Sequence, residues 1–140
     1  MGKYSAKVKC NYGQALNYHQ HSLAMYQALY TDNHPDIAHS LNTVGNAYHD
    51  LGNYQEALKY FSQSLTMYQE LYTGSHPDIA TSLYNVGIVY DALGQHQEAL
   101  KYYKQTLTMY QELYTGNHPY IQILKSNIDQ VQRRSEGNNV

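Results

Sequence analysis

Apolar residues recur at steps of three and four along most of the chain, which is the spacing of one face of an α-helix. The segment from His34-Pro35 to Leu51-Gly52 carries such a face at Ile37, Leu41, Val44, Tyr48 and Leu51. The segment from His76-Pro77 to Leu93-Gly94 carries it at Ile79, Leu83, Val86, Tyr90 and Leu93. A proline in the first turn and a glycine just past the end are typical boundaries of a helix. We call these two helices A-type.

A second kind of amphipathic segment follows each A-type helix, and it has two apolar stripes. In the segment 54–72 one stripe holds Tyr54, Leu58, Phe61, Leu65, Tyr68 and Tyr72, and the other holds Ala57, Tyr60, Ser64, Met67 and Leu71. Two stripes indicate that this B-type helix has neighbours on both sides. The string LTMYQELYTG at its end recurs unchanged at 107–116.

The two segments together form a repeat of 42 residues. Laying 34–75 over 76–117 leaves 29 of the 42 positions identical. A fixed period of this length predicts an all-α solenoid of antiparallel helix pairs, a right-handed superhelical stack in which each unit packs on the next. The expected order is one unpaired B-type helix, two A–B pairs and a final A-type helix, which makes six helices. The predicted parts are a segment 1–11, a helix 12–33, repeats 34–75 and 76–117, a capping helix 118–132 and a polar, frayed tail 133–140.

Composition narrows the class of protein. Charged residues make up 14% of the chain and the net charge is −2, which argues against a nucleic-acid surface because such a surface needs clustered basic residues. No apolar run suits a signal peptide or a membrane span. The single cysteine, Cys10, fits a reducing compartment, so we expect a cytoplasmic protein. Seventeen tyrosines recur in columns, such as 26/68/110 and 30/72/114, which favours packing between units.

The spacing of the large and small residues resembles the tetratricopeptide repeat. The pattern is carried by Leu41, Val44, Gly45, Tyr48, Ala57 and Phe61, and again by Leu83, Val86, Gly87, Tyr90, Ala99 and Tyr103. The glycine on the A-type helix lets the B-type helix approach closely. A 42-residue period with His-Pro at the head of the A-type helix is similar to the kinesin-light-chain type of this repeat. The resemblance implies a scaffold that binds a peptide or a protein.

The resemblance also implies where a partner would bind, because the A-type helices of this family line a concave groove. The matching positions are His39, Asn42, Asn46 and His49 in the first repeat and Thr81, Tyr84, Asn85, Ile88 and Asp91 in the second. Seven of the thirteen differences between the repeats fall on this face of the A-type helix. A binding face would vary in this way, but so would exposed positions that are free of packing constraints.

Other functional classes find little support in the residues. His34, His76 and His118 recur one period apart, so they sit on different units and cannot share one metal ion; we expect structural residues of the turn. No catalytic constellation and no phosphate-binding loop is present. We therefore expect no enzyme activity, no cofactor and no metal.

The ends of the array suggest how the chain avoids or permits association. In the last helix Lys125 and Asp129 replace the leucine and the glycine of the repeats, while Ile121, Leu124, Ile128 and Val131 remain apolar toward the preceding unit, as in a cap. At the other end we expect an exposed patch made by Leu16, His19, Leu23, Tyr26 and Tyr30.

Two arrangements would cover that patch. Either residues 1–10, with Tyr4, Ala6 and Val8, fold over it, or two chains pair through it about a two-fold axis, which is the arrangement we favour. The function hypotheses are therefore a binding module, a self-associating repeat unit, and a fragment or idealised repeat array with no ligand of its own.

Overall fold

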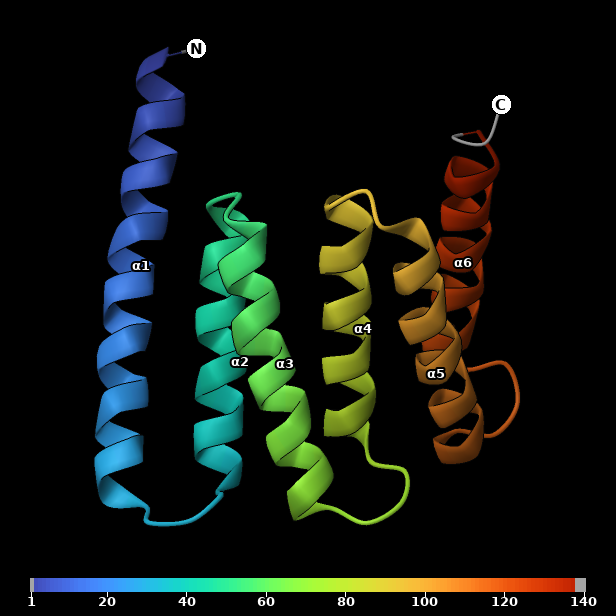
Figure 1. The fold of residues 1–140 in the computed structure, drawn as a ribbon, viewed down its shortest axis with the longest axis horizontal. Helices are drawn as coiled ribbons and strands as arrows, with labels where there is room; N and C mark the ends of the chain where they lie inside the picture. The colour runs from blue at the N-terminus through green and yellow to red at the C-terminus, as the bar shows by residue number, and fades with distance from the viewer. Residues whose placement is uncertain (1, 138–140) are drawn as a thin grey trace. The chain divides into compact units, whose positions relative to one another are not determined.

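The chain folds entirely from α-helices in the part that the structure describes. A computed structural model describes the backbone of residues 2–137 and the side chains of residues 11–137. Its helices are α1 (Gly2–Leu29), α2 (Pro35–Asp50), α3 (Tyr54–Leu71), α4 (Pro77–Ala92), α5 (His96–Leu113) and α6 (Pro119–Gly137). Figure 1 shows these helices joined by short loops. The all-α class and the alternation of A-type helices (α2, α4, α6) with B-type helices (α1, α3, α5) are confirmed.

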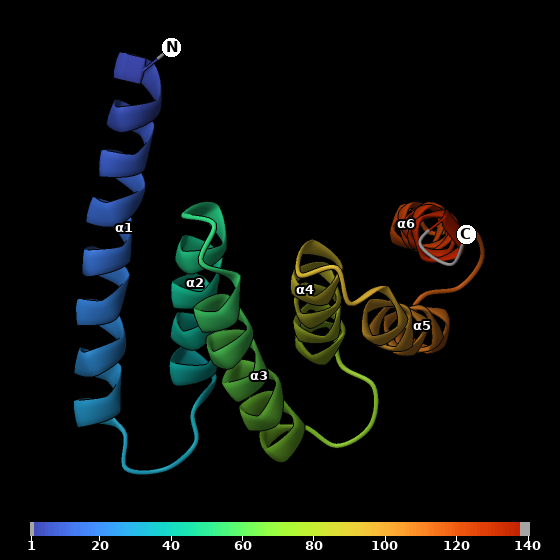
Figure 2. The same cartoon turned by 45° about the horizontal axis from the view of Figure 1, so that its top comes forward.

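The helices form two compact units, Met1–Leu71 and Tyr72–Val140. In the first unit α2 packs against both α1 and α3, and in the second unit α5 packs against both α4 and α6. Consecutive helices within a unit run antiparallel (Figure 2). The antiparallel helix pairs are thereby confirmed, and the right-handed superhelical sense stays a prediction.

The A-type helices begin at the predicted histidine and proline. His34 has extended backbone angles, and its ring Nδ1 accepts a hydrogen bond from the backbone N–H of Asp36 at 3.0 Å. His76 caps α4 in the same way through the backbone N–H of Asp78, also at 3.0 Å. At the other end Gly52 and Gly94 have φ angles of 79° and 80°, which a side chain would strain. Both predicted boundaries of the A-type helices are confirmed.

The two glycines inside the A-type helices mark the closest approach to the following helix. A Cβ atom at Gly45 would lie 2.7 Å from ring carbons of Phe61, and one at Gly87 would lie 2.7 Å from ring carbons of Tyr103. Both aromatic side chains are buried. The predicted close contact between A-type and B-type helices is therefore confirmed in both units.

Each unit has its own apolar core. In the first unit a cluster of Leu23, Ile37, Leu41 and Val44 is flanked by half-buried tyrosines and Met67. In the second unit the cluster consists of Ala99, Leu100, Tyr103, Leu124, Ile128 and Val131. The predicted inward-facing residues of the last helix (Ile121, Leu124, Ile128 and Val131) are all buried, whereas Lys125 and Asp129 are exposed.

Both ends of the chain differ from the predicted boundaries. The backbone of residues 2–10 continues α1 without a break, so this segment does not turn back over the helix; its side chains, Tyr4, Ala6 and Val8 among them, lie outside the described residues. Cys10 occupies the position that Gly52 and Gly94 hold in the repeats, and a non-glycine residue resists the positive φ that ends α2 and α4. The helix therefore runs through.

The last helix is longer than the predicted 118–132. It continues to Gly137, and Ser135, which we assigned to a frayed tail, is buried. Polar contacts with the rest of the second unit explain why the added turn is ordered.

Candidate functional site

The predicted binding residues of the first repeat lie on α2. His39 and Asn46 are exposed, and Asn42 and His49 are half-buried. The His49 ring lies 5.3 Å from the ring of Tyr54. This face of α2 is therefore polar and largely accessible within the first unit.

The predicted binding residues of the second repeat lie on α4, and two of them help to hold α6. Thr81 is exposed, while Tyr84, Asn85, Ile88 and Asp91 are half-buried. The hydroxyl of Tyr84 accepts a hydrogen bond from Nδ2 of Asn127 at 2.6 Å. Tyr84 and Ile88 also pack against the core cluster of this unit. Part of the expected binding face is thus used inside the molecule.

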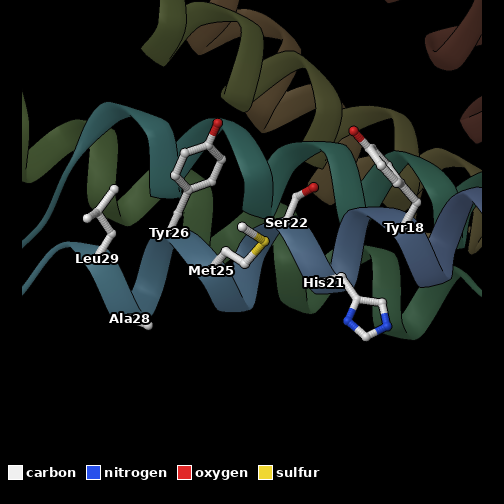
Figure 3. A pocket seen from close by; sticks show the side chains of 7 residues that line it. All are labelled: Tyr18, His21, Ser22, Met25, Tyr26, Ala28 and Leu29. Carbon is white, nitrogen blue, oxygen red and sulfur yellow. The ribbon is translucent and has the colours of Figure 1, made fainter.

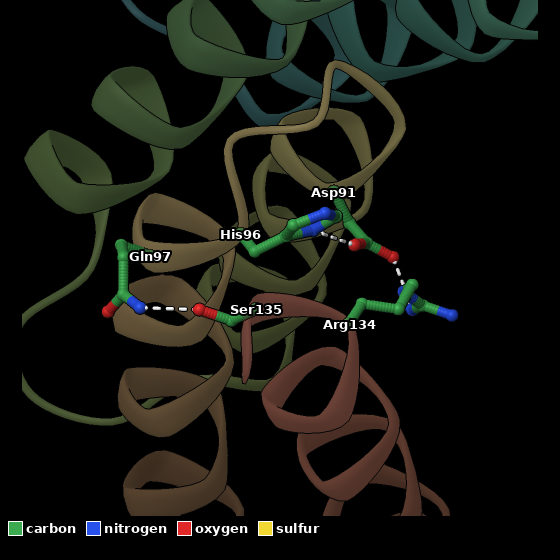
Figure 4. Close-up of polar contacts among 5 residues, drawn as sticks. All are labelled: Asp91, His96, Gln97, Arg134 and Ser135. Carbon is green, nitrogen blue, oxygen red and sulfur yellow. Dashed lines mark hydrogen bonds and ion pairs between the residues drawn. The ribbon is translucent and has the colours of Figure 1, made fainter. Parts of the chain in front are cut away.

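Asp91 is engaged by other residues of the second unit. One carboxylate oxygen lies 2.8 Å from Nδ1 of His96, and the other accepts a hydrogen bond from Arg134 at 2.6 Å (Figure 4). Gln97 donates to the hydroxyl of Ser135 at 2.6 Å on the same side. Both oxygens of Asp91 therefore fix α6 and the α4–α5 turn, a role that we did not expect because we assigned Arg134 to the tail.

A cleft opens between α4, α5 and α6. It has a volume of about 220 Å³ and is lined by Tyr84, Tyr110, Tyr120, Ile123 and Leu124. Tyr120 and Ile123 are 51% and 55% exposed. Our sequence prediction included Tyr84 alone. The available signal was that Tyr120 stands where the other repeats have Asp36 and Asp78, and Ile123 where they have His39 and Thr81.

None of the described side chains that line this cleft carries a charge. Burial, followed by the neighbouring Tyr114 and Tyr84, raises the pKa of Tyr110 above its usual value. The Tyr110 hydroxyl is therefore uncharged at pH 7, and the site suits an uncharged group.

The predicted association residues on α1 face inward and not outward. Leu23 is buried against α2, and Leu16, Tyr26 and Tyr30 pack around the same cluster. His19 is half-buried. The prediction that these five residues form an exposed patch is wrong, because most of them pack against α2 of their own unit.

A different side of α1 is exposed. Tyr18, Met25 and Leu29 are 69%, 72% and 68% exposed. They line a shallow depression together with other residues of the same helix, namely His21, Ser22, Tyr26 and Ala28 (Figure 3). The first helix therefore has an exposed apolar surface, and Tyr26 is the one residue of the predicted five that lines it.

The three recurrent histidines are structural residues of the turn, as predicted. Each ring stacks on the tyrosine that ends the preceding B-type segment, with centroids 3.5 Å apart for Tyr30–His34, 3.7 Å for Tyr72–His76 and 4.2 Å for Tyr114–His118. Nδ1 of His118 also accepts from the backbone N–H of Tyr120 at 3.2 Å. One of the tyrosine columns is therefore used to pack the helix caps.

Metal binding and membrane insertion find no support in the described residues. In the part of the chain that the structure describes, no group of three or more His, Cys, Asp or Glu side chains is placed to hold a metal ion. None of the helices described here combines the length and the apolar character that crossing a bilayer requires.

Comparison with known proteins identifies the repeat. Solved structures with the same fold include the nearly identical TPR-like repeats of a putative kinesin light chain from Podosopora anserina, with a TM-score of 0.83 and 19% identity. BtubC (BKLC) from P. vanneervenii follows with a TM-score of 0.77 and 17% identity. The matches cover 96% and 86% of this chain, and 64% and 48% of those chains. The chain thus spans less than two thirds of these relatives.

The sequence itself matches a family model. No match was found among curated protein sequences. The model of the tetratricopeptide repeat, however, matches residues 7–70 and 41–112, which is more than half of the chain. Repeats of this family are generally scaffolds for protein interactions. The chain belongs to the tetratricopeptide-repeat family, and its fold is that of the kinesin-light-chain type of the repeat.

Proposed function

We propose that the chain binds a segment of another protein on the face of its A-type helices, and that the cleft between α4, α5 and α6 holds an apolar or aromatic side chain of that segment. The observation that carries this proposal is the pair Tyr120 and Ile123, two exposed apolar residues at the rim of a cleft of about 220 Å³. Recognition clefts of this kind combine an apolar lining with a few polar groups that orient the ligand.

The chemistry of the lining favours a neutral anchor. The rings of Tyr84, Tyr110 and Tyr120 present flat apolar surfaces, and all the lining residues that the structure describes are uncharged. A charged anchor would lose its hydration there without gaining an ion pair. Tyrosine hydroxyls at the rim can exchange hydrogen bonds with the backbone of an extended or helical segment.

Polar positions on the A-type helix of each repeat form the remaining part of the proposal. We propose that His39, Asn42, Asn46 and His49 contact the partner in the first unit, and that Thr81 and Asn85 do so in the second. The support is that these positions differ between the repeats, whereas most of the buried positions are identical. A partner in the cytoplasm, with no nucleic acid, membrane or cofactor involved, fits the composition of the chain.

A peptide library displayed on phage and selected on the intact chain tests the proposal. We expect the enriched peptides to share an apolar or aromatic anchor residue. A double variant, Tyr120→Asp with Ile123→Thr, places in α6 the residues that the repeat 76–117 has at the same positions. It should keep the fold and lose most of the affinity for these peptides.

The matched control removes exposed apolar residues elsewhere. Met25→Gln on α1 should leave the affinity for the selected peptides unchanged. A selection that enriches no common anchor, or peptides that bind the double variant as tightly as the original chain, would overturn the proposed site.

A further inference from the structure

The exposed side of α1 is chemically the side with which the other B-type helices cover an A-type helix. We define the outer face of α1 as Ala15, Tyr18, Ser22, Met25 and Leu29. On α3 the equivalent residues are partly or fully buried (Ala57, Tyr60, Ser64, Met67 and Leu71). There, Ser64 donates a hydrogen bond to the backbone carbonyl of Ala38 on α2 at 2.7 Å, and the Tyr60 ring lies 5.5 Å from that of Tyr48.

In the part of the first unit that the structure describes, no helix covers the outer face. Tyr18, Met25 and Leu29 are about 70% exposed in the unit (69%, 72% and 68%). A preceding A-type helix would have to turn at the position of Cys10, but α1 continues through that position as one helix from Gly2. A solvent-exposed apolar stripe of this length is a marker of an interaction surface.

The residue spacing favours another helix as the partner. Ala15, Tyr18, Ser22, Met25 and Leu29 are separated by three, four, three and four residues. This alternation is the seam with which two helices pack along their length. The partner helix is not an A-type helix. In the repeats, the rings of Phe61 and Tyr103 pack directly on the glycine of the A-type helix, a contact that we call the glycine notch. On α1 the equivalent residue is His19.

A head-to-tail contact with α6 of another copy is also disfavoured. On α6 the residues equivalent to the buried Leu83 and Gly87 are Lys125 and Asp129, which are exposed. An apolar stripe facing these charges would desolvate them without compensation. The one helix in the chain that carries a matching apolar seam on an uncovered side, among those described, is α1 itself.

We propose that two copies of the chain pair through the outer face of α1, with the two helices antiparallel about a two-fold axis. The charge along the helix gives the direction. Between Gly2 and Leu29 the sequence has three lysines, all before Asn11, and no acidic residue. Parallel helices would bring the lysine-rich ends together, whereas antiparallel helices place each such end near the partner's helix C-terminus, which carries the negative end of the dipole.

Sedimentation velocity of the full chain, from micromolar to millimolar concentration, measures the association. We expect a reversible monomer–dimer equilibrium without larger species. A variant with Met25→Glu and Leu29→Glu changes two exposed side chains and should keep the helical circular dichroism. It should raise the dimer dissociation constant by about tenfold or more, because the seam would then bury charges.

The control variant is Ile123→Glu, which adds a charge at an exposed apolar residue of α6. It should leave the dimer dissociation constant unchanged while weakening the peptide binding proposed above, so that the two proposals fail independently. A chain that stays monomeric at millimolar concentration would overturn the dimer, as would growth to polymers or an equal effect of Ile123→Glu on association.

The direction of pairing is tested by a distance. In a background with Cys10→Ser, a nitroxide label at Asn11→Cys should lie about 33 Å along the helix axis from its counterpart in an antiparallel pair centred on Ser22, the middle of the outer face, from the rise of about 1.5 Å per residue. Parallel helices would place the two labels about 10 Å apart, the distance between packed helices. Double electron–electron resonance of the labelled dimer measures this distance. The short value would overturn the antiparallel arrangement.

Discussion

A single histidine side chain caps each A-type helix and stacks on the tyrosine before it. His76 accepts the backbone N–H of Asp78 at 3.0 Å, and its ring lies 3.7 Å from that of Tyr72. The two contacts can be separated, because asparagine also accepts such a hydrogen bond but has no ring. This makes the residue a direct test of what fixes the start of α4.

We expect His76→Ala to lower the free energy of unfolding by about 1–2 kcal/mol, since it loses both contacts. His76→Asn should cost less than His76→Ala because it keeps the cap. Urea unfolding followed by circular dichroism measures both. If the two variants are equally destabilised, the stack and not the cap stabilises this turn.

Two buried serines differ in whether their hydroxyl makes a hydrogen bond. Ser64 donates to the carbonyl of Ala38 at 2.7 Å, whereas the buried hydroxyl oxygen of Ser82 has no hydrogen-bond partner among the described residues. Removing a satisfied hydroxyl loses a hydrogen bond, and removing an unsatisfied one relieves a desolvation cost.

Ser64→Ala should therefore lower the free energy of unfolding by about 1 kcal/mol, and Ser82→Ala should raise it by a similar amount. The pair is its own control, because the same atom is deleted from a fully buried serine in each case. Thermal unfolding of the two variants gives the sign. A loss of stability in Ser82→Ala would show that its hydroxyl has a partner.

At the scale of the element, the glycine notch sets how closely α4 and α5 pack. A Cβ at Gly87 would sit 2.7 Å from the buried ring of Tyr103, so Gly87→Ala should lower the free energy of unfolding by about 1–3 kcal/mol. Gly13 lies inside α1 with nothing within 4 Å of its added Cβ. Gly13→Ala should therefore stabilise by about 0.5–1 kcal/mol. Chemical unfolding of both variants tests the notch, and changes of the same sign would contradict it.

The sequence predicted the elements well where one residue type is required by the backbone. Gly52 and Gly94 end α2 and α4 with a positive φ, and the His-Pro pairs begin them. The ends of the chain were predicted less well. Ser135 belongs to a helix because Gln97 bonds its hydroxyl, and such a long-range contact leaves no periodic signal in the sequence.

The faces of the helices were harder to predict than the helices themselves. A B-type helix has two apolar stripes, and periodicity alone does not say which stripe meets the helix before it and which the helix after it. We therefore assigned Leu16, Leu23 and Tyr30 to an exposed patch, although they cover α2. The sequence did not predict the cleft for a related reason. Tyr120 and Ile123 line it only because α6 packs beside α4, where Asn127 donates a hydrogen bond to Tyr84.

At the scale of the whole molecule, ionisation of the tyrosines distinguishes the two units. In the second unit burial raises the pKa values of Tyr90, Tyr103 and Tyr110, most strongly that of Tyr103. In the described part of the first unit a raised pKa is found at Tyr30, whose hydroxyl donates to Asp36 at 2.9 Å. A tyrosine in the unfolded chain ionises near pH 10. As the pH rises above this value, the unfolded state loses protons that the folded state keeps, so stability falls.

The second unit should consequently lose its structure at a lower alkaline pH than the first. Methyl NMR signals of Val44 and Val131, which are buried in the first and second unit, report the two transitions in one titration.

Tyr103→Phe removes the most strongly shifted hydroxyl and introduces the residue that the first repeat has at this position, Phe61. It should move the Val131 transition to higher pH and leave that of Val44 in place. Tyr18→Phe, which changes an exposed tyrosine of the first unit, is the control. Simultaneous loss of both signals, unaffected by Tyr103→Phe, would show that the buried tyrosines do not determine the alkaline limit.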